Sequence, residues 1–294
     1  MLFPDARNDW SACWEHRAMN EEGSIMITQQ ANGPATDVVI GAGSGMGEAV
    51  ARRLAVDSHR LVLADIDAGA AERVASELGG DVQVCHCDIT SRGDLEAIAA
   101  TTGPVRRLVL TAGLSPTMAA GRRVLEVDLV GPALLLDVFG SQTGSGAVAL
   151  LFSSMAGHFV PPAVEIDAVL DRPLAPTLLD DLKSAGVDVD EPGTAYGYAK
   201  RGLLRLVRRE AHSWGQRGAR LLSLSPGIID TPMGRRENAA QPVMEEMVTG
   251  SPLGRSIEAD EVAVVATFLL SRAASAMTGT DVLVDGGVVA AITG

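Results

Sequence analysis

Tyr196 and Lys200 are the residues whose types and spacing could do chemistry, and they lie four positions apart at the head of a strongly helical run. On a helix this spacing places both side chains on one face, one turn apart. A tyrosine has a pKa of about 10 and is protonated at neutral pH, but a neighbouring ammonium favours the phenolate. The pair could therefore move a proton to or from an oxygen atom. Alone it is a weak signal, because an interfacial tyrosine beside a solvated lysine has the same spacing.

A glycine-rich turn between a short apolar strand and an amphipathic helix is the second chemical signal. Residues 38–40 form the strand and residues 48–55 belong to the helix. Glycines in such a turn let the backbone approach a pyrophosphate, which rests on the helix N-terminus. The spacing is G-x-x-x-G-x-G rather than the commoner G-x-G-x-x-G. We expect a dinucleotide to be bound by Gly41, Ser44, Gly45, Met46 and Gly47.

The second predicted strand, residues 60–64, ends in an acidic residue, Asp65. At this position a carboxylate accepts hydrogen bonds from the ribose hydroxyls of an adenosine and repels a 2′-phosphate. The sequence therefore favours NAD over NADP as the cofactor. Asp65 could also cap the helix that begins near residue 68, and both roles stay open.

Strands and helices alternate along the rest of the chain. We expect strands at residues 82–87, 105–110, 147–152, 220–224 and 281–284, and helices at residues 94–100, 125–139 and 259–270. This alternation predicts an α/β fold, a Rossmann-type doubly wound parallel sheet of about seven strands in a single domain. Such sheets bind ligands at the carboxyl ends of their strands. The residues expected at that edge are the glycine loop, Asp65, Asp88, Ala112, Gly113 and Ser154.

Composition excludes several classes of partner. The chain has 294 residues and a formal net charge of −13, which suits neither nucleic acid nor an anionic membrane surface. No apolar run reaches the roughly 18 residues of a membrane helix. The three cysteines lack the paired spacing of a zinc site, so we expect no metal. We expect a cytoplasmic protein whose partner is a small molecule.

From about residue 36 to its end the chain resembles the short-chain dehydrogenase/reductase family. The matching motifs, in the family's order, are Gly41-x-x-x-Gly45-x-Gly47, Asp88, Ala112-Gly113, Ser153-Ser154, Tyr196-x-x-x-Lys200, Pro226 to Thr231 and Asp285-Gly286-Gly287. Within the family the chain is most similar to the bacterial 3α-hydroxysteroid dehydrogenase/carbonyl reductase branch. The resemblance implies an NAD(H)-dependent oxidoreductase that interconverts a secondary alcohol and a ketone and forms a homodimer or homotetramer. A steroid-like carbonyl is suggested, and thioesters, quinones and sugars stay open.

The resemblance also implies a role for each site residue. Tyr196 would be the general acid/base, Ser154 would hydrogen-bond the substrate oxygen, and Lys200 would lower the pKa of Tyr196 and bind ribose hydroxyls. Ile229 and Thr231 would hold the carboxamide of the nicotinamide. The remaining cofactor-binding positions are Asp88, Ile89, Ala112 and Gly113.

Asp128 departs from the family, which has an asparagine at this position. A carboxylate could pair directly with Lys200 and alter the pH dependence, or it could belong to a structural cap. Both interpretations stay open. Asp128 is also the only hint of an alternative function, an NAD-binding regulatory or structural protein with weak or no turnover.

Three segments lie outside the usual family pattern. Residues 158–194 separate Ser154 from Tyr196, and their position favours a wall or lid of the substrate site, with a subunit interface as the alternative. Residues 1–35 lack periodicity, and we expect a loosely ordered N-terminal extension of which the first 25 residues could be an added leader. Residues 233–250 look mobile, and their methionines could close over an apolar substrate or pack in the core.

Overall fold

Seven strands form one parallel sheet in the computed structural model, which describes residues 35–241 and 243–294. Their order across the sheet is β3-β2-β1-β4-β5-β6-β9. The strands are β1 (Thr36–Ile40), β2 (Arg60–Asp65), β3 (Val82–His86), β4 (Val105–Leu110), β5 (Thr143–Phe152), β6 (Arg220–Pro226) and β9 (Asp281–Val284). The central strands are nearly continuous apolar runs, as parallel strands covered on both faces must be. The predicted doubly wound sheet of about seven strands is confirmed.

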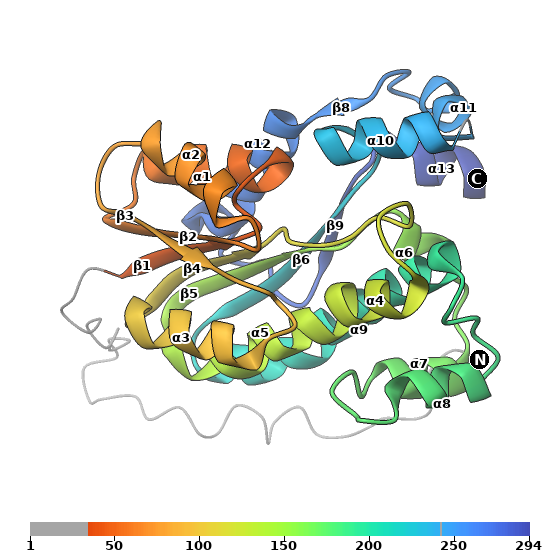
Figure 1. Ribbon diagram of the computed structural model, residues 1–294, viewed down its shortest axis with the longest axis horizontal. Coiled ribbons are helices and arrows are strands. Elements are labelled where there is room, and N and C mark those ends of the chain that lie inside the picture. The colour runs from red at the N-terminus through yellow and green to blue at the C-terminus, as the bar shows by residue number, and fades with distance from the viewer. Residues whose placement is uncertain (1–34, 242) are drawn as a thin grey trace, which may run out of the picture. The chain divides into compact units, whose positions relative to one another are not determined.

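Helices cover both faces of this sheet (Figure 1). One face is covered by α1 (Gly45–Ala55), α2 (Ala68–Ser76) and α12 (Ala259–Leu270). The other face is covered by α3 (Arg92–Thr102), α5 (Gly131–Phe139) and α9 (Pro192–Gln216). Each face has its own apolar core, with Leu54 and Leu269 on the first and Leu95, Leu135 and Leu203 on the second.

The direction in which strands are added reverses between β1 and β4. From β1 the chain proceeds outward through β2 to β3, and it then returns to place β4 on the other side of β1. The backbone N–H groups of Thr111 and Ala112, just after β4, both donate to the Ile40 carbonyl at the end of β1, at 2.8 and 3.1 Å. In open α/β sheets ligands bind in the crevice at such a reversal, and the glycine loop begins there.

The predicted helix over residues 125–139 starts earlier and is not regular. It consists of α4 (Gly121–Leu125), a π-helical turn η2 (Glu126–Val130) and α5. A π-helical turn accommodates one extra residue within a helix, and such turns often occur at functional sites. Asp128 lies inside this turn and is buried.

Residues 158–194 are largely helical and contain an apolar cluster of their own. They contain the end of α6 (Ala156–Phe159), then α7 (Val164–Leu170) and α8 (Leu178–Ser184), and they lead into α9. The buried side chains that this segment contributes are Leu170, Leu178, Leu182, Val187 and Val189. These side chains pack against Leu125, Leu129, Ala195 and Ala199, so the segment is attached to the body of the domain through one apolar face.

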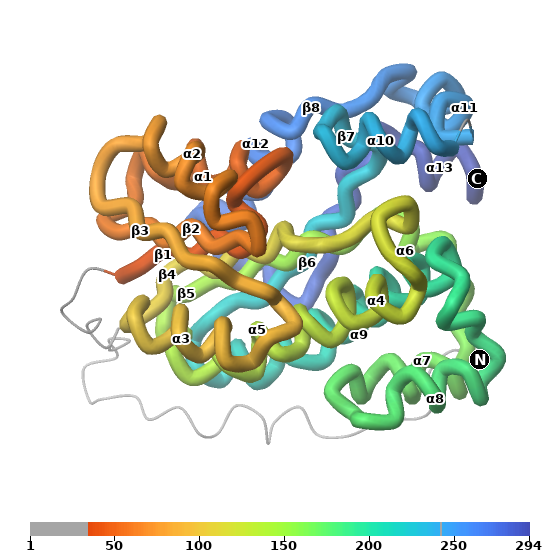
Figure 2. The backbone as a smooth tube through the Cα atoms, viewed as in Figure 1, coloured from red at the N-terminus to blue at the C-terminus, as the bar shows by residue number. Residues whose placement is uncertain are grey.

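Ion pairs also attach α7 to α9, beside which it lies (Figure 2). Asp167 contacts Arg201 at 2.6 Å and Arg205 at 3.0 Å, and Asp171 contacts Arg205 at 2.5 Å and Arg209 at 3.8 Å. The three arginines recur every four residues, which places them on one face of α9. We call this set the arginine ladder.

The segment that looked mobile, residues 233–250, lies mostly in two helices, α10 (Pro232–Ala240) and α11 (Val243–Gly250). They follow the short strand β7 (Ile229–Asp230), which pairs with β8 (Ile257–Glu258). Met244 and Met247 on α11 pack with Met155, Phe159, Ile228 and residues of α13 (Val288–Thr293). These two methionines therefore pack in an apolar cluster beside Met155, the residue that follows Ser154.

The N-terminal extension was predicted over residues 1–35, of which residues 1–34 lie outside the described residues. The described residues from 35 onward belong to one compact unit, and every predicted site residue lies among them. Within residues 35–241 and 243–294, no helix is both long and apolar enough to cross a membrane.

Candidate active site

The helix that carries Tyr196 starts at a well-defined cap. Pro192 occupies its first turn, and the Glu191 carboxylate accepts hydrogen bonds from the N–H groups of Gly193 at 2.8 Å and Thr194 at 2.5 Å. Proline at the start and an acceptor at the N-cap both stabilise a helix N-terminus. The position of Pro192 in the first turn is a helix-start signal that can be read from the sequence. This cap fixes the turn that precedes Tyr196.

Lys200 lies between two oxygen atoms inside the domain. Its side chain is buried, and Nζ lies 3.3 Å from Asp128 Oδ1, 3.4 Å from the Phe152 carbonyl oxygen and 5.4 Å from the centre of the Tyr196 ring. Asp128 therefore pairs directly with the lysine, which was one of the two alternatives. The same carboxylate accepts a hydrogen bond from the Leu114 N–H at 3.1 Å, so it also holds the loop after β4.

These charges set the proton affinities of the site. Burial raises the pKa of Tyr196 above its ordinary value; the Lys200 ammonium opposes that rise, and the Asp128 carboxylate adds to it. Burial disfavours the charged lysine, but Asp128 and Tyr196 outweigh this effect and raise the pKa of Lys200. Burial likewise raises the pKa of Asp128 against the attraction of Lys200. The lysine thus acts on the tyrosine in the expected direction, and Asp128 weakens its effect.

Gly113 is required by the position of Asp128. A Cβ atom at Gly113 would lie 2.6 Å from Asp128 Oδ1 and 3.5 Å from Lys200 Nζ. Any other residue would push against the buried ion pair. The absence of a side chain at Gly113 therefore leaves space for the Lys200–Asp128 ion pair.

Ser154 follows the end of β5 and is 9% exposed. Its Oγ accepts a hydrogen bond from the Ala156 N–H at 3.1 Å, while the neighbouring Ser153 Oγ donates to the Lys200 carbonyl at 3.0 Å. The second bond joins the end of β5 to α9. Burial raises the pKa of Tyr196, and both Lys200 and the Ser154 hydroxyl oppose that rise. The structure thus brings Ser154, Tyr196, Lys200 and Asp128 together.

The glycine loop folds tightly against itself. A Cβ atom at Gly47 would lie 1.9 Å from the Gly41 carbonyl oxygen, so only glycine fits there. Ser44 stands at the N-cap of α1 but its side chain makes no capping hydrogen bond. The first N–H groups of α1, from Gly45 and Met46 onward, therefore have no side-chain acceptor at their N-cap, which is the arrangement that an anion can use.

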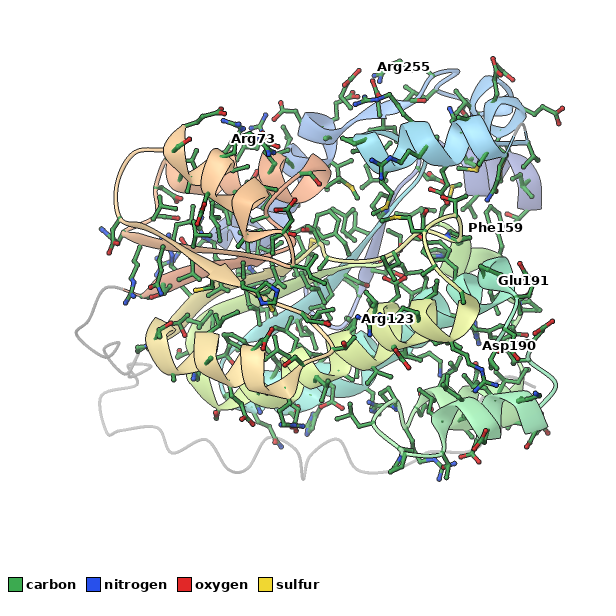
Figure 3. All side chains as sticks on the ribbon, in the orientation of Figure 1. Arg73, Arg123, Phe159, Asp190, Glu191 and Arg255 are labelled. Carbon is green, nitrogen blue, oxygen red and sulfur yellow. The ribbon has the colours of Figure 1, made fainter. Side chains whose placement is uncertain are left out.

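Asp65 is attached to this loop. Its Oδ2 accepts a hydrogen bond from the Gly43 N–H at 2.8 Å and its Oδ1 accepts one from the Asp67 N–H at 3.0 Å. The capping alternative for Asp65 is wrong, because Asp67 is the N-cap of α2 and accepts from the Ala70 N–H. Sequence reasoning missed Arg73 on α2, which donates to the Gly43 carbonyl at 2.8 Å (Figure 3).

The other predicted cofactor residues lie in the loops beyond β3, β4 and β6. Asp88 pairs with Arg123 of α4 at 3.2 Å, a partner that the sequence did not reveal, and Arg123 is labelled in Figure 3. Thr231 accepts a hydrogen bond from the Gly234 N–H at 3.0 Å and so caps α10. A Cβ atom at Gly45 would lie 3.3 Å from Thr231 Cγ2, so the start of α10 faces the glycine loop. The remaining predicted positions, Ile89, Ala112 and Ile229, are buried or half-buried beside them.

Metal-binding groups and surface hollows were the other features that could carry chemistry. In the described part of the chain, no group of three or more His, Cys, Asp or Glu side chains could hold a metal ion. A hollow of about 690 Å³ lies between α5, residues 171–175 and the second half of α9. Its lining includes Leu136, Leu206 and Trp214 and none of the predicted site residues.

Models of known protein families match both halves of the chain. A family model described as "short chain dehydrogenase" matches residues 36–164, and one described as "Enoyl-(Acyl carrier protein) reductase" matches residues 182–289. A short-chain dehydrogenase/reductase of Alternaria brassicicola is 34% identical and aligns over 87% of this chain and 96% of its own. A galactitol 2-dehydrogenase (L-tagatose-forming) of Cereibacter sphaeroides is 32% identical over 85% of this chain and 92% of its own.

The hydroxysteroid branch is also among the relatives. The 3-alpha-hydroxysteroid dehydrogenase/carbonyl reductase of Comamonas testosteroni is 28% identical over 85% of this chain and 95% of its own. A solved 7 alpha-hydroxysteroid dehydrogenase, in complex with NADH and 7-oxo glycochenodeoxycholic acid, superposes with a TM-score of 0.70 at 27% identity. That superposition covers 86% of this chain and 93% of the other.

Proposed function

The chain belongs to the short-chain dehydrogenase/reductase family, and we propose that it is an NAD(H)-dependent oxidoreductase that interconverts a secondary alcohol and a ketone. The observation that carries this proposal is the placement of Ser154 and Tyr196 with the buried Lys200–Asp128 pair at the carboxyl end of β5. The glycine loop begins at the same edge of the sheet, after β1.

Each side chain in this arrangement has a task that its chemistry allows. Ser154 donates a hydrogen bond to the reacting oxygen of the substrate and holds it in place. Tyr196 takes the proton from an alcohol or gives one to a ketone. Lys200 stabilises the phenolate by its charge and holds the ribose hydroxyls of the cofactor. The cofactor, when bound, supplies the hydride transfer.

The residues present fit a dinucleotide. Ser44 leaves the N-terminus of α1 open to an anion, and the contact of Gly47 with the Gly41 carbonyl keeps this loop narrow enough for close backbone approach. Asp65, held by the Gly43 N–H, would accept from the ribose hydroxyls. Asp88, Ile89, Ala112 and Gly113 would line the adenine and ribose side, and the Ile229 backbone with Thr231 would hold the carboxamide.

For the substrate, the relatives support two classes of secondary alcohol. The hydroxysteroid dehydrogenases support an alicyclic alcohol of steroid type. The galactitol 2-dehydrogenase supports a small polyol. We further propose a homodimer or homotetramer. We also propose that residues 158–194 form a wall of the substrate site at their start, where Phe159 packs with Met155.

The test of the proposed function is turnover. Purified full-length protein is mixed with NAD and a panel of secondary alcohols, and with NADH and the matching ketones, while the nicotinamide absorbance is followed. We expect a change in absorbance with at least one pair of compounds in both directions. Protein that binds NADH and turns over no compound of a broad panel would instead support a binding protein without turnover.

Cofactor choice gives a prediction about Asp65. We expect NADH to bind at least about tenfold more tightly than NADPH, because a carboxylate at the ribose repels the 2′-phosphate. Asp65→Asn removes this charge and keeps an oxygen that can accept from the Gly43 N–H, so the affinity ratio should fall towards one. Asp67→Asn is the matched control, since it removes an equal charge two residues away. Equal affinity of the unmodified protein for both cofactors would contradict the assignment.

The Lys200–Asp128 pair gives a prediction about pH. Asp128 raises the pKa of Tyr196, so the Asp128→Asn enzyme should have a lower tyrosine pKa. Alcohol oxidation needs the phenolate and rises through that pKa, whereas ketone reduction needs the phenol and falls through it. In both directions the midpoint of the pH–rate profile should therefore move to lower pH.

The control for this prediction is Asp137→Asn, which removes an exposed carboxylate from α5, the helix that continues from η2. It should leave the profile unchanged. If Asp128→Asn folds normally and its profile coincides with that of the unmodified enzyme, Asp128 only supports the Leu114 loop.

A further inference from the structure

Arg73 is the side chain of α2 that reaches the glycine loop. Its Nη2 donates a hydrogen bond to the Gly43 carbonyl oxygen at 2.8 Å (Figure 3). Among the described residues this is the only hydrogen bond between α2 and residues 41–47. Ala70 lies one helix turn earlier, and a Cβ atom at Gly43 would come within 2.9 Å of its Cβ atom. Residues three apart on a helix are neighbours on its surface, so Arg73 extends from the face of α2 that packs against the loop.

Gly43 is held through both of its backbone polar groups. Its N–H donates to Asp65 Oδ2 at 2.8 Å, and its carbonyl oxygen accepts from Arg73. Gly43 is buried and has no space for a side chain, since a Cβ atom would also lie 2.9 Å from Asp65 Oδ2. A glycine has little conformational preference of its own. The two hydrogen bonds therefore orient its backbone, and with it the N–H that holds Asp65.

These contacts form a closed ring that contains the Asp65 carboxylate. Oδ2 is bound to the glycine loop, and Oδ1 accepts from the Asp67 N–H at 3.0 Å, where α2 begins. Arg73, on the last turn of the same helix, contacts the loop again. A carboxylate oxygen has two lone pairs, so each oxygen of Asp65 can still accept a hydroxyl. Loss of the Arg73 hydrogen bond would open the ring.

From this ring we infer that Arg73 is a positioning residue for the adenosine half of the cofactor: it holds Gly43, and through Gly43 it keeps the Asp65 carboxylate in place for the ribose. The inference rests on the proposed function, since it presupposes that a dinucleotide binds at the glycine loop. An acceptor that is already held in place does not have to be ordered when its ligand binds, and this raises the affinity. The same fixed carboxylate repels a 2′-phosphate, so Arg73 also contributes to the preference for NAD over NADP.

An arginine near the ribose could instead bind a 2′-phosphate directly, as arginines do in dinucleotide-binding folds that take NADP. The contacts of Arg73 favour the positioning role. Nη2, the atom that donates to Gly43, also lies 3.7 Å from Glu48 Oε2 on the first turn of α1. The guanidinium is thus already engaged with a carbonyl and a carboxylate of the protein. The two roles predict opposite effects on cofactor choice.

The experiment measures the affinities of NADH and NADPH by fluorescence titration in the unmodified protein and in Arg73→Met. Methionine keeps an unbranched apolar stem and removes every donor, and the Arg73 side chain is 55% exposed, so the core should be undisturbed. NADH should bind about three- to tenfold more weakly, the effect of one hydrogen bond. NADPH affinity should change by less than about twofold, so the preference for NADH should fall.

Two further variants serve as controls. Arg73→Lys keeps the charge and a donor, so it should retain most of the preference for NADH. Arg53→Met on α1 removes an arginine whose partner is Asp260, outside the ring, and should leave both affinities unchanged. NADPH binding that weakens more than NADH binding in Arg73→Met would assign Arg73 to the phosphate. Equal weakening of both would make it only a support of the loop, and either result would overturn the inference.

A double-mutant cycle tests whether Arg73 acts through Asp65. In the Asp65→Ala protein the carboxylate is absent, so adding Arg73→Met should change NADH affinity by less than about twofold. An undiminished effect in that protein would show that Arg73 acts on the cofactor by another route and would contradict the inference.

The outcome for the proposed function is read separately, from turnover. An Arg73→Met enzyme that turns over and binds NADH as tightly as the unmodified one would overturn the inference and leave the oxidoreductase standing. A reduced preference for NADH in a protein that turns over no compound would support the inference and contradict the oxidoreductase. If the unmodified protein bound no NADH, both would be contradicted.

Discussion

Tyr196→Phe should reduce turnover by about 10²- to 10⁴-fold, the usual contribution of a general acid or base. The substitution keeps the ring and removes only the oxygen that can carry the proton. The Lys200–Asp128 pair makes no hydrogen bond to that oxygen, so it should stay in place. NADH affinity should therefore be nearly unchanged. Steady-state kinetics in both directions and an NADH titration measure the two effects separately.

Tyr198→Phe is the internal control for this result. Tyr198 is two residues further along α9 and packs against the apolar cluster of residues 158–194, on another side of the helix from the catalytic group. Loss of its hydroxyl should change kcat by less than about threefold, because that group is remote from the reacting atoms. If Tyr196→Phe kept most of its activity, another group would have to transfer the proton.

The second large effect concerns the fold. Replacing residues 160–190 with a short Gly-Ser bridge should abolish cooperative folding. The segment contributes five buried apolar side chains, Leu170, Leu178, Leu182, Val187 and Val189, whose burial stabilises the fold by roughly 8–15 kcal/mol in sum. A whole domain is stable by only about 5–15 kcal/mol. The deletion would also leave the arginine ladder without its carboxylates.

Two point variants keep this prediction testable when the deletion protein cannot be purified. Leu182 is fully buried, and Leu182→Ala should lower the free energy of unfolding by about 2–5 kcal/mol. Leu174 lies in the same segment but is 42% exposed, so Leu174→Ala should cost less than about 1 kcal/mol. Urea denaturation measures both. Equal effects, or a deletion protein as stable as the intact one, would mean that the segment does not support the domain.

The fold could be predicted because each strand is a local apolar run and each crossover is a local helical pattern. The strands over residues 105–110 and 281–284 and the helix over residues 259–270 have the bounds that the pattern predicted. The π-helical turn around Asp128 could not be predicted, because the helix is apolar on nearly all sides there and hides the shift in phase that an extra residue causes. The packing of residues 158–194 depends on contacts with α4 and α9, which are distant in sequence.

The site residues that could be predicted are those that follow the end of a strand or lie one helix turn apart. Tyr196 and Lys200 are joined by helical spacing, and Asp65 and Ser154 follow apolar strands. Arg73 and Arg123 act through partners 30 and 35 positions away in the chain. Only the folded arrangement reveals them.

The arginine ladder has a consequence for the history of this chain. Its three cations on α9 are matched to carboxylates that belong to the segment between Ser154 and Tyr196, so neither set is useful without the other. Without this segment, the same face of α9 would be exposed to solvent or to another subunit. The three arginines would then lack the carboxylates of Asp167 and Asp171. We therefore expect relatives that lack the segment to lack these arginines as well. In relatives that have lost the segment, we expect all three positions to carry residues other than arginine.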